Sequence, residues 1–284
     1  MKKVYFGLLC FFGFGLFSQT NEEAMPHSTN SKGEEYSVMD EEAMIAYRED
    51  RHEQLVESLA LSNLSSAHQE LFANALAAVF VGIPVSSYSQ STHGQMFSDE
   101  IPEERESWQV SAAGQIEGKD NPTVRRLTGD SPFRFFPPTP FLPETAKLIK
   151  DSEREATVVF ELDLDESDSN GASFVSKYPG EFIWMFEFTA NKKDQSPKRI
   201  EIKLKQPVRE RFRYKITTVS TELLYSFVES CGCFAVSKSK AQINGSSKRM
   251  GQIRMSMETR FSDIACEKPY RYLLPTKAPN NLPF

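Results

Sequence analysis

Apolar and polar side chains alternate with a period of two along much of the chain after Glu155. This alternation runs through several short segments and two longer ones: 158–164, 182–188, 200–204, 212–216, 223–236 and 251–261. A period of two places successive side chains on opposite faces of a β-strand. The pattern therefore predicts six consecutive strands, each with one apolar and one polar face.

The connections between these segments are mostly short and polar, and Asn244–Ser247 has the composition of a turn. Parallel strands need crossovers of a dozen or more residues, so strands connected in this way pair antiparallel. In the last segment Ile253, Met255 and Met257 face one way, and the intervening polar residues face the other. Residues 156–262 are predicted to form a curved antiparallel meander of about six or seven strands, open or partly closed into a barrel.

Residues 37–82 follow a different period, close to 3.6 residues. Ser37 and Asp40 have the spacing of a capping box before a first amphipathic helix that ends near residue 60. Ser66 and Gln69 have the same relation at the start of a second helix, which Gly82 closes. The two predicted helices form an antiparallel hairpin with an apolar face, and together with the sheet they define an α+β fold.

The remaining segments show no sustained period. Residues 19–36 are polar and predict a disordered leader. Residues 83–155 are predicted to be irregular, with one strand near 108–116 and a short helix at 144–150, and residues 263–284 form a C-terminal tail. Residues 37–284 are expected to fold as a single α+β domain.

The first 18 residues have the organisation of an export signal. Lys2 and Lys3 precede the uncharged run Val4–Phe17, which contains five phenylalanines, and Ser18 supplies a small residue for cleavage. The mature chain contains no other apolar run approaching the roughly 20 residues of a membrane-spanning helix. The sequence predicts a signal peptide at 1–18, a periplasmic or extracellular protein, and no transmembrane segment after cleavage.

Charge is distributed unevenly over the chain, whose formal net charge is −6. Residues 19–170 contain 29 acidic and 11 basic residues, whereas residues 171–284 contain 10 acidic and 20 basic ones. This asymmetry favours either docking of the two halves or an anionic partner for the basic half. The net negative charge and the predicted compartment disfavour nucleic acid as a partner.

Much of the basic charge falls on the polar side of two neighbouring predicted strands. The candidate ligand-binding residues there are Arg199, Lys203, Lys205, Arg211, Arg213 and Lys215. Such a basic face could bind the phosphates of a lipid surface, an acidic glycan or the acidic half of the same chain. The alternative is a solvated sheet face with no ligand.

Three cysteines remain after the predicted cleavage, and an oxidising compartment favours one disulfide. We expect Cys266 to pair with Cys231 or with Cys233, which leaves one free thiol. An acidic segment before Gly171 suggests a calcium loop, but Lys177 occupies the place where a bidentate glutamate is required. No metal or cofactor is predicted.

Catalytic motifs are weak in this sequence. It has no G-x-S-x-G motif, and His93, beside Gly94, is the histidine most worth testing. The leading hypothesis is a non-catalytic envelope protein that binds an apolar or anionic, lipid-like ligand on or within the sheet. One alternative is a secreted hydrolase acting on glycans or esters, whose carboxyl groups should have raised pKa values. Another is a structural or assembly protein of the cell envelope with a protein partner.

Overall fold

A computed structural model describes the chain from residue 27 to residue 275, with internal gaps. The described residues are 27–31, 33, 35–79, 82–119, 123–125, 131–133, 141–162, 183–210, 214–249 and 251–275. The predicted signal peptide, most of the predicted leader and the end of the C-terminal tail lie outside them. So do the acidic segment before Gly171 and two of the candidate basic residues, Arg211 and Arg213.

The helical hairpin is present, with α1 at Glu41–Leu59 and α2 at Ser66–Val79. The N-cap of α1 is Asp40, whose Oδ1 accepts a hydrogen bond from the Ala43 amide at 2.9 Å. The predicted capping role of Ser37 is wrong, because Ser37 lies in a strand. The apolar stripe of α2 is buried, including Phe72 and Leu76.

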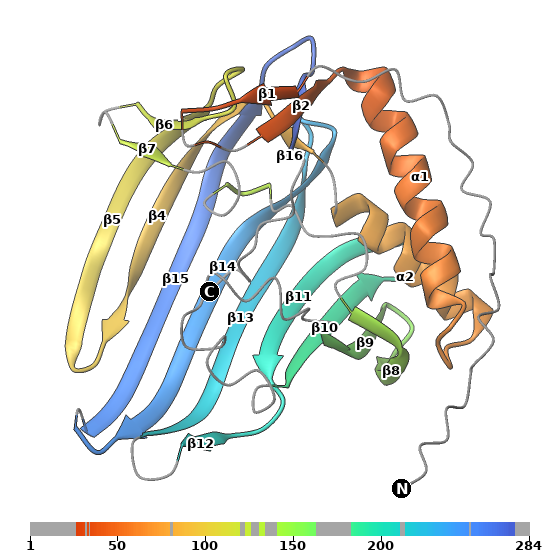
Figure 1. Cartoon of the computed structure of the whole chain (residues 1–284). Helices are drawn as coiled ribbons and strands as arrows, with labels where there is room; N and C mark the ends of the chain where they lie inside the picture. The colour runs from red at the N-terminus through yellow and green to blue at the C-terminus, as the bar shows by residue number, and fades with distance from the viewer. Residues whose placement is uncertain are drawn as a thin grey trace, which may run out of the picture.

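A large antiparallel sheet makes up most of the molecule (Figure 1). It has 12 strands, and its hydrogen-bonded order is β7-β6-β5-β4-β15-β14-β13-β11-β10-β9-β8, with β12 paired to β13. The strands are β4 (Ser86–Met96), β5 (Asp99–Val110), β6 (Ile116–Gly118), β7 (Val124–Arg125), β8 (Phe141–Asp151), β9 (Glu155–Leu162), β10 (Trp184–Asn191), β11 (Ser196–Leu204), β12 (Val208–Glu210), β13 (Tyr214–Val228), β14 (Cys233–Ser247) and β15 (Gly251–Cys266).

The sheet is antiparallel as predicted, but it is larger than the expected six or seven strands and it is not a closed barrel. Among the described residues β7 and β8 are its edges. It also departs from a simple meander, because β15 pairs with β4 from much earlier in the chain. Through this pairing the sheet continues past β15, its last strand in chain order, to the strands β4, β5, β6 and β7.

The segment 83–155 was expected to be irregular and instead contains strands. β4 is rich in serine, threonine and glutamine and has no apolar alternation, so sequence periodicity does not reveal it. Its backbone is hydrogen-bonded on both sides, to β5 and to β15. The predicted short helix at 144–150 is part of β8, because that segment pairs with β9.

A second, four-stranded sheet has the order β1-β2-β16-β3. Its strands are β1 (His27–Thr29), β2 (Glu35–Met39), β3 (Ile83–Pro84) and β16 (Tyr272–Pro275). Parts of the expected disordered leader and of the C-terminal tail are therefore ordered, because they pair with each other. Met39, Met44 and Tyr272 form a small cluster that connects this sheet to α1.

Two turns differ from the prediction. Asn244–Ser247, expected to be a turn, continues β14 because these residues pair with both neighbouring strands. The expected strand 223–236 is divided between β13 and β14 by a turn at 229–232. Gly232 has φ +61° there, a conformation that glycine adopts without steric cost.

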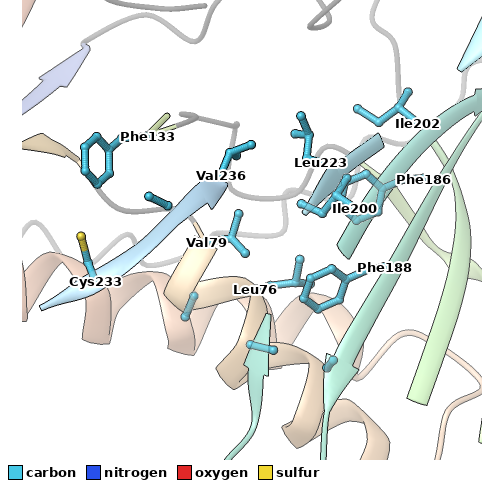
Figure 2. Packing of buried hydrophobic residues seen from close by; sticks show 14 of the residues in the cluster. Leu76, Val79, Phe133, Phe186, Phe188, Ile200, Ile202, Leu223, Cys233 and Val236 are labelled. Atoms are coloured by element: carbon cyan, nitrogen blue, oxygen red, sulfur yellow. The ribbon is translucent and has the colours of Figure 1, made fainter. Parts of the chain in front are cut away.

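The core lies between the hairpin and the sheet (Figure 2). The alternation after Glu155 is confirmed, because Val158, Phe160, Phe186 and Phe188 are fully buried. Figure 2 shows Leu76 and Val79 of α2 near this sheet face. α2 contacts β10, β11 and β14, so the hairpin covers one half of the sheet.

Candidate functional site

The predicted basic face carries an ion-pair network. Arg199 pairs with Glu187 and lies 3.4 Å from Glu201 and 3.3 Å from Glu222. Lys203 lies 2.6 Å from Glu187 and 3.1 Å from Glu201. Lys205 pairs with Glu161. Each of these three candidate residues therefore contacts at least one carboxylate from another strand.

The electrostatics of the network favour these internal pairs. Burial by itself lowers the pKa of Arg199, but the attraction of Glu187, together with Glu222 and Glu201, outweighs it and leaves the pKa raised. The same balance raises the pKa of Lys203, where Glu187 and Glu201 act against burial. An external anion at this face would have to compete with carboxylates that are already in place.

Of the three other predicted cations, the structure describes only Lys215. Lys215 is half-buried on β13, opposite Arg209 and Ser246, while Arg211 and Arg213 lie outside the described residues. The role of the six residues as a ligand site stays a prediction.

Glu187→Gln should lower the free energy of unfolding by about 2 to 3 kcal/mol. Glu187 is buried between two cations, and breaking a buried pair typically costs about 3 to 5 kcal/mol. The expected loss is smaller here because Arg199 and Lys203 both keep their ion pairs with Glu201. Urea unfolding measures the effect, with Glu161→Gln as a control that should cost less than about 1 kcal/mol. Equal losses in the two variants would contradict the central position of Glu187.

A row of apolar side chains crosses the far half of the sheet. Val219 on β13 is opposite Ile243 on β14, Ile243 is opposite Met255 on β15, and Met255 is opposite Met96 on β4. Ile101 and Met257 are neighbours of this row on the same face. We call the six residues together the methionine strip: Met96, Ile101, Val219, Ile243, Met255 and Met257. The row spans four strands, or about 14 Å.

The methionine strip lies on the same face as the core. Met257 is four residues before the buried Phe261 on β15, and Val219 is four residues before the buried Leu223 on β13. Residues separated by an even number of positions in a strand point to the same face. Met96 and Met257 are nevertheless 43% and 45% exposed, and the other members are half-buried. The opposite face of β15 carries Arg254, Ser256 and Glu258. The predicted burial of the apolar face of this strand holds for Ile253 and Phe261, whereas Met257 is exposed.

The helical hairpin does not cover this half of the sheet. Figure 1 shows α1 and α2 beside β8 to β11, whereas β4 and β5 lie at the opposite side. The sheet contacts of α2 are with β10, β11 and β14. The exposed methionines therefore lie beyond the part of the core that the hairpin closes.

His93, the predicted catalytic candidate, lies on β4 opposite Glu258. Hydrogen bonding from Lys238 and Arg260 lowers the pKa of Glu258. Hydrogen bonds also lower the pKa values of three other carboxyl groups. The chief donor to Asp151 is Lys192, and the chief donors to Glu155 are Lys150 and Lys198. The chief donors to Asp263 are Ser262 and Ser89. None of these four carboxyl groups has the raised pKa of a general acid, and none lies in the segment 83–143 to which the hydrolase alternative assigns its acids.

Cys231 and Cys266 form a disulfide, with Cα atoms 5.1 Å apart, and Cys233 is a buried free thiol. The disulfide connects the β13–β14 turn to the end of β15. Burial raises the pKa of the Cys233 thiol to about 11, so it is neutral at physiological pH. Within the described ranges no group of three or more His, Cys, Asp or Glu side chains could hold a metal ion.

A pocket of about 470 Å³ lies where α1 and α2 meet the β13–β14 turn. Its lining residues are Arg48, Glu49, His52, Glu53, Asn74, Ala77, Ala78, Phe227, Gly232, Cys233 and Phe234. Sequence reasoning missed this pocket. Arg48 and His52 are four residues apart and so share a helix face, but no local signal places them beside Phe227 and Phe234.

Comparisons with known proteins give little help. No protein-family model and no curated protein matches the chain. The crystal structure of a LolA superfamily protein from Nitrosomonas europaea is similar, with 11% sequence identity and a TM-score of 0.30. The similarity covers 70% of this chain and 93% of that protein. A likeness of this size does not establish a shared family or ligand. Neither helix of the described chain has the length and hydropathy to cross a bilayer.

Proposed function

We propose that this chain is an exported, non-catalytic envelope protein that binds an apolar, lipid-like ligand against the methionine strip. The observation that carries the proposal is the half-exposed apolar row on the core side of the sheet. Soluble proteins normally bury such a face or use it to bind a partner. The signal-like first 18 residues and the Cys231–Cys266 disulfide support an oxidising compartment outside the cytoplasm.

The composition of the strip supports a flexible apolar ligand. Methionine side chains are unbranched and polarisable, and they adapt to ligands of irregular shape. Met96, Met255 and Met257 are neighbours across β4 and β15. No charged side chain belongs to the strip itself, and Asp99, opposite Met96, follows it at the outer end of the row. Removal of apolar surface from water supplies the driving force.

Met257→Glu should weaken binding of an uncharged, fluorescently labelled long-chain acylglycerol by about tenfold or more. The glutamate places a charge where the acyl chain would displace water, and a tenfold loss corresponds to about 1.4 kcal/mol. Fluorescence titration of the mature protein measures the affinity. Ser256→Glu is the matched control, because it adds the same charge to the same strand on the opposite face.

The proposal predicts that Ser256→Glu binds the acylglycerol as the unmodified protein does. Equal weakening by both variants would show a general charge effect and contradict the site. Retained affinity in Met257→Glu would also contradict it. Absence of any binding by the unmodified protein would exclude an uncharged acyl ligand and with it this function.

A further inference from the structure

The pocket at the β13–β14 turn is distinct from the methionine strip. Phe227 lines the pocket, and Val219 of the strip is eight residues earlier on β13, or about 26 Å along the strand. The volume of about 470 Å³ is within the range of small-molecule sites.

Arg48 and His52 both line the pocket. Nε and Nη2 of Arg48 and Nε2 of His52 are closed off from solvent and make no hydrogen bond within the described structure. Buried donors without partners are costly, and a guanidinium keeps its charge at every physiological pH. A ligand that carries hydrogen-bond acceptors would satisfy these atoms once the Arg48 and His52 side chains turn toward it.

The positions of the free nitrogens specify the kind of acceptor. Nε and Nη2 lie on the same edge of the guanidinium, and their two parallel N–H groups match the two oxygens of a carboxylate. The guanidinium carbon lies over the ring of Tyr272, 5.9 Å from the ring centroid. His52 follows Arg48 by one helical turn and supplies a further polar contact on the same face.

Another part of the lining is apolar. Ala77 and Ala78 of α2 and the rings of Phe227 and Phe234 form it, and these two rings pack edge to face with centroids 5.3 Å apart. Phe227 is 54% exposed, which is unusual for a phenylalanine without a ligand. Cys233 adds a neutral thiol to the lining, so no thiolate opposes an anion here.

The remaining charges limit how negative the ligand can be. Glu49 and Glu53 are exposed members of the lining, so the pocket holds two carboxylates against one permanent cation. This lining disfavours each negative charge on a ligand, and it disfavours a dianion such as a phosphate monoester more than a monoanion. A monoanion uses its one charge to pair with Arg48, while water screens the exposed Glu49 and Glu53.

We propose that this pocket binds a small monoanionic carboxylate attached to an apolar body, with Arg48 pairing with the carboxylate and the Phe227–Phe234 pair holding the apolar part. The site is additional to the methionine strip and does not depend on it. Its ligand is recognised by charge and shape together, whereas the strip recognises apolar surface alone.

The test uses the mature protein and three related probes: phenylbutyrate, the uncharged phenylbutanol and the dianionic phenyl phosphate. We expect phenylbutyrate to bind at least about tenfold more tightly than either of the others, because only it fits both parts of the lining and the charge balance. Calorimetry measures affinity, and the NMR signal of the His52 ring should shift on titration with phenylbutyrate.

Arg48→Gln should abolish the preference for phenylbutyrate over phenylbutanol, and Phe227→Ala should weaken both. Phe227 is exposed, so its variant retains the fold and keeps the test valid if Arg48→Gln is unstable. Arg254→Gln is the control for loss of one positive charge on the remote polar face and should leave all three affinities unchanged.

Unchanged phenylbutyrate affinity in Arg48→Gln or in Phe227→Ala would overturn the proposal, as would equal or tighter binding of phenyl phosphate. Binding of phenylbutyrate without a response of the His52 signal would place it elsewhere and overturn the site as well. The acylglycerol titration is independent of these results, because it uses an uncharged ligand and variants of the strip.

Discussion

Phe186→Ala is expected to lower the free energy of unfolding by about 3 to 5 kcal/mol, the cost of removing a fully buried phenylalanine ring. Phe186 packs between other rings of the core. Its ring centroid lies 5.5 Å from that of Phe141 and 6.4 Å from those of Phe160 and Phe188. These rings come from the three strands β8, β9 and β10, and Phe72 of α2 packs against Phe188, so the vacated volume can collapse only partly.

Urea unfolding followed by circular dichroism measures this loss. Phe227→Ala is the matched control, because it removes the same ring from a position that is 54% exposed. It should cost less than about 1 kcal/mol. Comparable losses in the two variants would contradict the packing of the core around β8, β9 and β10.

Replacing both Cys231 and Cys266 with serine should cost about 3 to 4 kcal/mol. The disulfide closes a loop with a sequence separation of 35, and its removal restores conformational entropy to the unfolded chain. The double variant avoids an unpaired thiol at either position. The midpoint of urea unfolding should fall, while the unmodified protein should show the same fall only when a reductant is present.

Cys233→Ser provides the comparison for the disulfide. Cys233 is a buried free thiol, so its replacement affects packing but no covalent connection. We expect this variant to stay sensitive to reductant and the double variant to be insensitive. A reductant-sensitive double variant, or an insensitive Cys233→Ser variant, would contradict the Cys231–Cys266 pairing.

The sequence was most informative where local pattern and burial coincide. The apolar period of two around Phe160 and Phe186 reports a face that the hairpin covers, and the stripe containing Phe72 and Leu76 reports the covering helix. Both signals arise because the same residues that favour an element locally are those that the core buries.

The sequence was least informative for β4 and β8. β4 has Ser, Thr and Gln on both faces, and β8 is an edge strand with charged residues near its end. β4 is a strand because β15, distant in the sequence, satisfies its backbone hydrogen bonds, whereas β8 pairs with β9, the next strand in the chain. Periodicity reports side-chain burial and carries no information about such pairing.

The basic face shows the same limit for charge. Arg199 and Lys203 were correctly placed on the polar side of their strand, but their partners come from other strands. Glu187 on β10 and Glu222 on β13 are adjacent to Arg199 only through the register of the sheet. A count of charges along one strand could not show that they are paired.

By itself the sequence determined the α+β class, the helical hairpin, the amphipathic strands after Glu155 and the candidate disulfide cysteines, because each depends on neighbours in the chain or on a small set of residues. Tertiary structure alone decided the 12-stranded open sheet, the pairing of Cys231 with Cys266 and the pocket around Arg48. These features depend on contacts between distant segments, and such contacts are set by strand register and packing of the whole chain.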